Sequence, residues 1–213
     1  MRRKTKWALA LIPIIIVPAL IFGLYWGWKY FALPEWPDRK EYATIEARAE
    51  KALAFAKRHN MNEHYALFVD YAIPSGTPRL FVWDFEKHRI IASCYAMHGP
   101  GKGSTDKRPV FSNVPGSECS ALGRFLVTKE HGATLKRSFR MKGLDTDNQT
   151  AYARGLMIHS SGWVNSHCWM KYIPLHRTSC QGCVTVSSKG MRYLWQLVNN
   201  EEKPLLLWSY YVE

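Results

Sequence analysis

The sequence of 213 residues has no internal repeat, no low-complexity tract and no run of heptads, which excludes solenoid proteins and coiled coils. It is also poor in acidic residues, with 17 Asp and Glu against 29 Lys and Arg, so its net charge is +12. An excess of basic residues is typical of proteins that associate with an anionic partner, such as nucleic acid, a membrane surface or an anionic polymer. Because the basic residues are scattered rather than clustered, we expect no nucleic-acid partner.

Apolar residues, in contrast, are abundant. They make up 47% of the chain, and aromatic residues make up 14%. The chain as a whole is therefore not disordered and can bury a sizeable core. Its length suits one globular domain with an appendage, because two full domains would be crowded.

The N-terminal part predicts a membrane anchor. Four basic residues come first, and the run from Trp7 to Trp28 then carries no charge. At about 1.5 Å per residue, a helix of that length crosses a hydrocarbon core of roughly 30 Å. The missing small-x-small cleavage site disfavours a signal peptide, and the missing polar stripe disfavours a buried soluble helix. We predict a cytoplasmic basic end at residues 1–6 and a transmembrane signal anchor at residues 7–31, with the rest of the chain outside the cytoplasm.

Two patterns follow the anchor. Residues 32–60 combine a linker containing two prolines with an amphipathic helix over Arg39–His59. Residues 61–213 have short β-rich segments separated by turns. The expected strands are Tyr65–Ile73, Arg79–Phe85, Arg89–Met97, Arg124–Lys129, Leu135–Lys142, Ala153–His159, Val184–Val186 and Leu205–Val212, with a helix over Ser188–Val198. A helix followed by short strands predicts an α+β fold, mainly β, with a largely antiparallel sheet.

Residues 159–183 concentrate histidine and cysteine, and their spacing leaves several interpretations open. Cys180-x-x-Cys183 is a plausible half of a zinc site, but no second pair completes it. The same motif suits a thiol oxidoreductase, although thioredoxin-type motifs occur in a βαβ context that is missing here. Cys183 could instead be a nucleophile, or both cysteines could be ordinary buried or disulfide-bonded residues.

The nucleophile interpretation rests on the turn before Cys183. Gly182 allows a tight turn whose amide N–H groups can face an oxyanion. A thiolate also needs a histidine within hydrogen-bond reach. His159, which follows the apolar segment Leu156–Ile158, is the best-placed histidine for that role.

Several short motifs, taken in order, point to one enzyme family. Ile158-His159-Ser160-Ser161-Gly162-Trp163 is followed by Ser179-Cys180-Gln181-Gly182-Cys183. Upstream blocks include His98-Gly99, Phe111-Ser112-Asn113, His131-Gly132 and Gly143-Leu144-Asp145. Over residues 65–212 the chain resembles the murein L,D-transpeptidase catalytic domain.

The resemblance implies an L,D-transpeptidase-like mixed β-sheet domain and cysteine acyl transfer at peptidoglycan stem peptides. By position, Cys183 is the nucleophile and His159 the base, with the Ser160 carbonyl orienting the imidazole. The amides of Gly182 and Cys183 form the oxyanion hole. No cofactor and no metal are implied, because a thiolate needs none. The acyl acceptor stays open, since water would make the reaction that of a carboxypeptidase, and a non-catalytic wall-binding protein is the alternative outside enzymes.

The same resemblance suggests further roles and a location. Trp163, Gln181 and Arg154 are candidates for substrate binding. Trp163 has simple packing as its alternative role, and Arg154 has an ion pair with Asp145 or Asp147. The expected location is the bacterial inner membrane, crossed once, with the catalytic domain in the periplasm. The oligomeric state stays open.

The chain departs from the family pattern at Cys180, where serine is usual, and at Gln181. In an oxidising compartment cysteines tend to pair, and five cysteines leave one thiol over. We expect a Cys168–Cys180 disulfide, which leaves Cys183 as the free thiol. A Cys180–Cys183 disulfide, which would inactivate the enzyme, is the alternative.

Overall fold

The computed structural model describes residues 16–26, 37–135, 137–177 and 180–212. The chain forms two units, divided after Pro34, and in the first unit residues 16–26 are helical. Among the described residues, no helix is long and apolar enough to cross a membrane. The predicted basic end and the two outer parts of the predicted anchor lie outside the described residues. The transmembrane helix predicted at residues 7–31 is therefore not confirmed.

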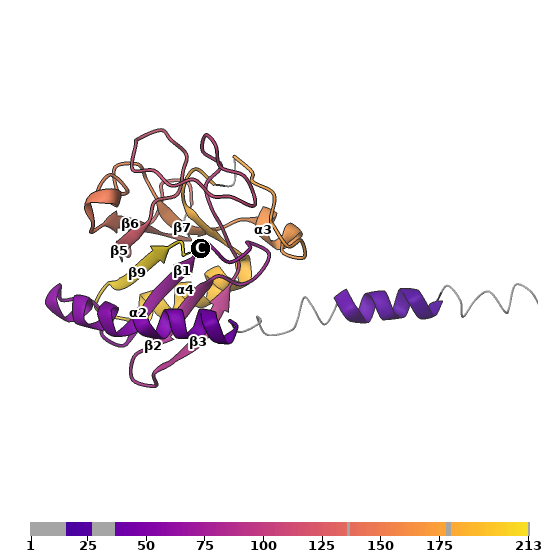
Figure 1. The fold of residues 1–213 in the computed structure, drawn as a ribbon, viewed down its shortest axis with the longest axis horizontal. Helices are drawn as coiled ribbons and strands as arrows, with labels where there is room; N and C mark the ends of the chain where they lie inside the picture. The colour runs from indigo at the N-terminus through magenta and orange to yellow at the C-terminus, as the bar shows by residue number, and fades with distance from the viewer. Residues whose placement is uncertain (1–15, 27–36, 136, 178–179, 213) are drawn as a thin grey trace, which may run out of the picture. The chain divides into compact units, whose positions relative to one another are not determined.

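The second unit begins with helix α2 (Arg39–Arg58), which confirms the amphipathic helix expected there (Figure 1). Asp38 Oδ1 accepts a hydrogen bond from the Glu41 amide at 2.8 Å, and the Glu41 carboxylate accepts one from the Asp38 amide at 2.9 Å. This reciprocal cap satisfies two amides that would otherwise have no partner at the start of the helix. The helix can therefore begin abruptly after the proline-containing segment.

The strands of the second unit form one nine-stranded sheet (Figure 1). They are β1 (Tyr65–Asp70), β2 (Leu80–Asp84), β3 (Arg89–Cys94), β4 (Ala96–Met97), β5 (Gly123–Val127), β6 (Ser138–Gly143), β7 (Met157–Ser160), β8 (Val184–Val186) and β9 (Leu205–Tyr210). Their order across the sheet is β3-β2-β1-β9-β5-β6-β7-β8-β4. The pairs β1–β9 and β7–β8 are parallel, and the other pairs are antiparallel. The prediction of a mainly β, mixed-sheet fold is confirmed.

The two edge strands of this sheet are consecutive in the chain. β3 pairs with β2 at one end of the sheet and β4 pairs with β8 at the other, with only Tyr95 between β3 and β4. The sequence predicts a single strand over Arg89–Met97, whereas the structure breaks it at Tyr95 so that its two parts join opposite ends of the sheet. The sheet therefore curls until its ends meet.

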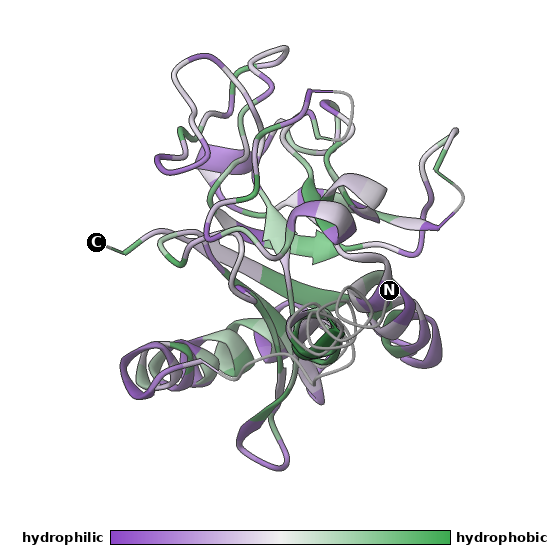
Figure 2. Ribbon diagram, turned by 90° about the vertical axis from the view of Figure 1, so that its right-hand side faces the viewer, coloured by the Kyte–Doolittle hydropathy of each residue, from purple (hydrophilic) through white to green (hydrophobic). Residues whose placement is uncertain are grey.

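Apolar side chains cover both faces of the sheet. Leu67 of β1 belongs to the buried cluster that includes Leu194 of α4 (Ser188–Asn200), whereas Phe68 belongs to the cluster that includes Ile45 of α2. Successive residues of a strand point to opposite faces, so β1 is apolar at nearly every position because both of its faces are buried. Figure 2 shows hydrophobic residues concentrated on the strands and hydrophilic residues along the outer sides of the helices.

The structure also contains two short helices that the sequence analysis does not predict, η1 (Thr146–Asn148) and α3 (Gly162–His167). α3 has six residues, too few for a helical period to show in the sequence. A local signal was nevertheless present, because Ser161 is the N-cap and its hydroxyl accepts a hydrogen bond from the Trp163 amide at 3.1 Å.

Candidate active site

The parallel pair β7–β8 brings the two predicted reactive residues together. His159 of β7 lies opposite Thr185 of β8 in the ladder. Cys183 directly precedes β8 and comes two residues before Thr185. Thr185 therefore shares a face of the sheet with His159, and Cys183, two residues earlier, lies at the end of that face. The site therefore depends on a pairing between segments that are far apart in the sequence.

The imidazole of His159 is buried and has a defined tautomer. Its Nδ1 lies 3.1 Å from the Ser160 carbonyl oxygen, which can only accept, so Nδ1 carries the proton and Nε2 has the lone pair. Burial lowers the pKa of His159, because the charged form loses its hydration. The resting imidazole is accordingly neutral near neutral pH, with Nε2 available as a base.

The thiol of Cys183 is buried as well, with the residue 8% exposed. Burial raises the pKa of this thiol, while backbone hydrogen bonds from Met157 and Gln181 and the charge of Arg154 act in the opposite direction. Neither side chain of the Cys183–His159 pair forms a hydrogen bond with the other within the described structure; Nε2 of His159 instead contacts the Thr185 hydroxyl at 3.2 Å. The resting pair is thus a neutral thiol beside a neutral imidazole.

The turn before Cys183 can be built only around glycine. Gly182 has a φ of +97°, and a Cβ atom there would lie 2.5 Å from the Cys119 carbonyl oxygen. A second glycine packs against the same turn, since a Cβ atom on Gly99 would lie 2.8 Å from the Gly182 nitrogen. The loops that contain Gly99 and Cys119 therefore pack directly on the nucleophile turn, which connects the His98-Gly99 block with the Cys183 motif.

The thiol of Cys180 lies inside this turn and forms hydrogen bonds with its backbone. The backbone amides of Gly182 and Cys183 hydrogen-bond its sulfur, and its thiol donates to the Cys183 carbonyl at 3.2 Å. The two amides predicted for the oxyanion hole thus face the Cys180 sulfur here. None of the five cysteines forms a disulfide. In the described structure the Cys168 thiol donates to the Asn165 carbonyl and the Cys180 thiol to the Cys183 carbonyl, and the Cys168–Cys180 disulfide stays a prediction.

Arg154 lies at the nucleophile turn, but its hydrogen bonds go to the protein itself. Its guanidinium donates to the Ser112 carbonyl at 2.6 Å, to the Ser117 hydroxyl at 3.2 Å and to the Cys119 carbonyl. The alternative ion pair with Asp145 is not formed, because the Asp145 carboxylate pairs with Arg124. Arg154 therefore ties the loop over residues 112–119 to the turn and contributes positive charge beside Cys183.

The other two predicted substrate-binding residues differ in exposure. Gln181 is exposed beside the nucleophile. Trp163 is half-buried against the apolar cluster that contains Cys180 and Cys183, and its indole N–H donates to the Pro174 carbonyl at 2.8 Å. Its ring stacks between those of His167 and His176, with centroid distances of 3.9 and 4.2 Å. Both histidines are half-buried and pack against Trp163 at the site.

A buried arginine that the sequence analysis did not single out holds the segment before the Gly-rich loop. Arg79, 1% exposed, donates to the Ala96 carbonyl at 2.7 Å, to the Ile73 carbonyl at 3.0 Å and to His98 Nδ1 at 2.9 Å. His98 Nε2 lies 2.9 Å from the Thr105 carbonyl, so His98 bridges Arg79 and the Gly-rich loop. Burial, together with the charge of Arg79, lowers the pKa of His98 to about 3. This neutral histidine fixes the start of the loop that packs on Gly182.

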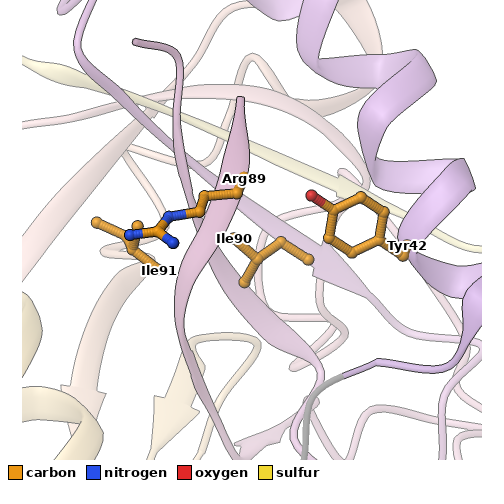
Figure 3. A pocket seen from close by; sticks show the side chains of 4 residues that line it. All are labelled: Tyr42, Arg89, Ile90 and Ile91. Atoms are coloured by element: carbon orange, nitrogen blue, oxygen red, sulfur yellow. The ribbon is translucent and has the colours of Figure 1, made fainter. Parts of the chain in front are cut away.

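The described residues bear on two further questions, a possible metal site and hollows at the surface. Among the described residues, no three His, Cys, Asp or Glu side chains gather closely enough to hold a metal ion. The hollow in Figure 3 lies between α2 and β3 and is lined by Tyr42, Arg89, Ile90 and Ile91. It contains none of the predicted site residues.

Comparison with known families gives this arrangement its context. A family model described as the L,D-transpeptidase catalytic domain matches residues 38–208. The chain belongs to this family. Membership supports a cysteine-dependent enzyme that modifies murein, and the match includes α2 as well as the whole sheet up to Trp208. The resemblance inferred from the short motifs is confirmed.

Two solved structures illustrate what this chain is similar to. An L,D-transpeptidase from Xylanimonas cellulosilytica is 17% identical, with 74% of this chain and 68% of that chain covered and a TM-score of 0.40. The helical cell shape determining protein Pgp2 from Campylobacter jejuni is 12% identical, with coverages of 79% and 57% and a TM-score of 0.47. This chain thus spans less than two thirds of the Pgp2 chain. A search of curated proteins gives no match.

Proposed function

We propose that the protein is a peptidoglycan L,D-transpeptidase that uses Cys183 for acyl transfer at the L,D-bond of murein tetrapeptide stems. The observation that carries the proposal is the juxtaposition of Cys183 and His159 on one face of β7–β8, with Nε2 of His159 available as base. A neutral thiol and a neutral imidazole suit a proton transfer that occurs when substrate binds.

The reaction would run in two halves. His159 Nε2 takes the proton of Cys183, and the thiolate attacks the carbonyl carbon of the bond before the terminal D-Ala. The oxyanion receives hydrogen bonds from the amides of Gly182 and Cys183, which exchange the Cys180 sulfur, a weak acceptor, for a charged oxygen. D-Ala then leaves with the proton held by His159, and a thioester remains. An amine of a second stem attacks the thioester, transfers a proton to His159 and restores the thiol.

A carboxypeptidase is the alternative on the same site, because water can replace the amine in the second half. In both reactions Gln181, exposed beside Cys183, would face the substrate, and Trp163 would form part of the wall of its groove. Arg154 has its donors directed at loop carbonyls, so we assign it to holding that loop and to supplying charge rather than to binding a substrate carboxylate.

We also propose that the enzyme is anchored once in a bacterial inner membrane with its catalytic unit in the periplasm. The support is the uncharged run Trp7–Trp28 preceded by four basic residues. Protease added to spheroplasts should digest the catalytic unit and leave a membrane-bound N-terminal fragment. Recovery of the intact chain in the cytoplasmic fraction would contradict the proposal.

The acyl-enzyme is the direct test of the chemistry. Full-length protein, kept reduced, is incubated with a disaccharide tetrapeptide, and intact mass is followed together with released D-Ala. We expect an adduct on Cys183, and a Cys183→Ala variant should lose activity by at least about 10³-fold while remaining folded. Cys94→Ala, a buried cysteine packed against α4 at Gly190, is the matched control and should still form the adduct.

The products then separate the two reactions. A cross-linked dimer of stems identifies a transpeptidase, and a tripeptide alone identifies a carboxypeptidase. If folded wild-type protein forms neither adduct nor product, the cysteine acyl-transfer proposal is wrong, and a wall-binding role becomes the better account.

A further inference from the structure

The hydroxyl of Thr185 contacts His159 Nε2, the nitrogen that acts as the base in the proposed reaction. Thr185 is fully buried in β8, and its hydroxyl oxygen lies 3.2 Å from His159 Nε2. Nδ1 of the ring carries the proton, so Nε2 can only accept, and the Thr185 hydroxyl is the donor in this contact. The single lone pair that should receive the Cys183 proton is therefore occupied in the resting structure.

The Thr185 hydroxyl has a second acceptor within reach. The sulfur of Cys180, which is 2% exposed and lies inside the nucleophile turn, is within hydrogen-bond reach of the same hydroxyl. A hydroxyl has one proton and rotates about its C–O bond, so it can donate to Nε2 or to the sulfur but not to both. Where this family usually has serine, the chain thus places a soft, weak acceptor beside the hydroxyl that controls the base.

We propose that Thr185 is a positioning residue that keeps the lone pair of His159 directed at the site and releases it to Cys183 by turning its hydroxyl toward Cys180. This inference rests on the proposed function of Cys183 and His159. It gives a role to Thr185 and to Cys180, neither of which is covalently changed in the reaction.

The proton movements balance without any further reactant. In the resting state the Thr185 O–H donates to Nε2. When substrate arrives, the O–H turns to the Cys180 sulfur, and the Cys183 S–H donates to Nε2 and transfers its proton there. When His159 returns that proton to the leaving amine, the Thr185 hydroxyl turns back. No bond of Thr185 or Cys180 breaks at any stage.

Burial lowers the pKa of His159, and the hydrogen bond to the Ser160 carbonyl raises it. The Cys180 sulfur lies within reach of the same Thr185 hydroxyl, and Cys183, on which the charge of Arg154 acts, comes two residues before Thr185. From β6, the neighbouring strand on the other side, the residue opposite His159 is Ser138, which does not titrate in this range. Loss of the Thr185 hydroxyl should therefore be visible in the titration of His159 itself.

The test compares Thr185→Val, which keeps the shape and removes the hydroxyl, with Thr185→Ser, which keeps the hydroxyl. Full-length proteins carrying ¹⁵N-labelled histidine are titrated by NMR, and kcat/KM is measured against pH with the tetrapeptide substrate. For Thr185→Val we expect the pKa of His159 and the acid limb of kcat/KM to move up together by about 0.5 to 1 pH unit, because the neutral imidazole loses its donor. We expect kcat to fall by about tenfold, with KM nearly unchanged.

In Thr185→Ser, the pKa of His159 and kcat should both return most of the way to the wild-type values. Thr128→Val is the matched control, because Thr128 is a half-buried hydroxyl that donates to the Arg140 carbonyl at the end of β5, and it should shift neither value. If the His159 titration in folded Thr185→Val equals that of the wild type, the inference is wrong even where the acyl-enzyme forms. If the wild type forms no acyl-enzyme, the proposed function fails instead, and the NMR titration still decides whether Thr185 controls the ring.

Discussion

The two halves of the sheet are built in different ways. Around β1 and β9 the strands have six residues each and are buried on both faces by apolar side chains. Around β7 and β8 the strands have four and three residues, and the loops beside them are held by hydrogen bonds to Arg79, Arg154 and Cys180. The first half gains its stability from burial of apolar surface. The second half uses backbone contacts and buried polar groups, which position reactive atoms but add less stability.

This comparison predicts that a large apolar truncation in the first half changes stability and leaves the chemistry alone. Phe68→Ala removes a fully buried ring between β1 and α2 and should lower the free energy of unfolding by about 3–5 kcal/mol. Urea unfolding measures this loss. The rate at which iodoacetamide modifies Cys183 in the folded variant should match that of the wild type, and a changed rate would break the distinction between the halves.

In the second half, one methyl group should disturb both stability and chemistry. Gly182→Ala places a Cβ atom at φ +97° and 2.5 Å from the Cys119 carbonyl oxygen, so the turn must shift. We expect a loss of roughly 2 kcal/mol or more, measured by urea unfolding, together with loss of acyl-enzyme formation.

Gly155→Ala is the matched control for that variant. Gly155 also has a positive φ, +71°, but a Cβ atom there would meet nothing within 4 Å. It should cost only about 1–2 kcal/mol of backbone strain and leave the acyl-enzyme intact. Equal loss of activity in both variants would show that strain alone, and not the contact with Cys119, determines the geometry of the nucleophile.

The last prediction concerns pH. The pKa of His98 is about 3 in the folded protein, below the ordinary value of 6.5, so the unfolded chain binds one more proton between these values. Stability should therefore fall as the pH drops below about 6.5, by about 1.4 kcal/mol per pH unit for this one proton.

His98→Gln keeps an acceptor for Arg79 and a donor for Thr105, and it should remove that part of the slope. Urea unfolding at several pH values between 4 and 7 measures it. The pKa of His159 is also lowered, so some slope of the same sign should persist in this variant. His88→Gln, an exposed position, should keep the wild-type slope, and an unchanged slope in His98→Gln would contradict the buried neutral state of His98.

Much of the apolar half could be predicted because its signals are local. The helix at residues 39–59 follows from its apolar stripe, and β1, β2 and β9 follow from runs of apolar and β-branched residues. The break at Tyr95 could not be predicted, because it depends on which distant strand each part of Arg89–Met97 pairs with. The short helix α3 was missed because six residues are too few to show a period.

Only some of the site residues could be predicted, again because motifs are local signals and contacts between distant segments are not. Cys183, His159 and the Ser160 carbonyl follow from the order of motifs, and in the structure His159 Nδ1 does contact that carbonyl. Arg79 and Thr185 belong to none of these motifs, and His98 stands in the His98-Gly99 block without an assigned role. Their importance comes from what is packed around them, and the sequence shows each only as an ordinary strand or turn residue.

The amino-acid sequence by itself determined most of the helices and strands and the family to which the chain belongs, and it is the basis for proposing Cys183 and His159 as the reactive pair. These properties depend on residue type and short-range spacing, which are present in the chain before it folds. Only the tertiary structure decided the partner of His159 Nε2, the acceptors of Arg154 and the inward direction of the Cys180 thiol. Those contacts join residues far apart in the chain or depend on how a turn is packed, and hydrogen bonds form only where folding brings donor and acceptor within about 3 Å.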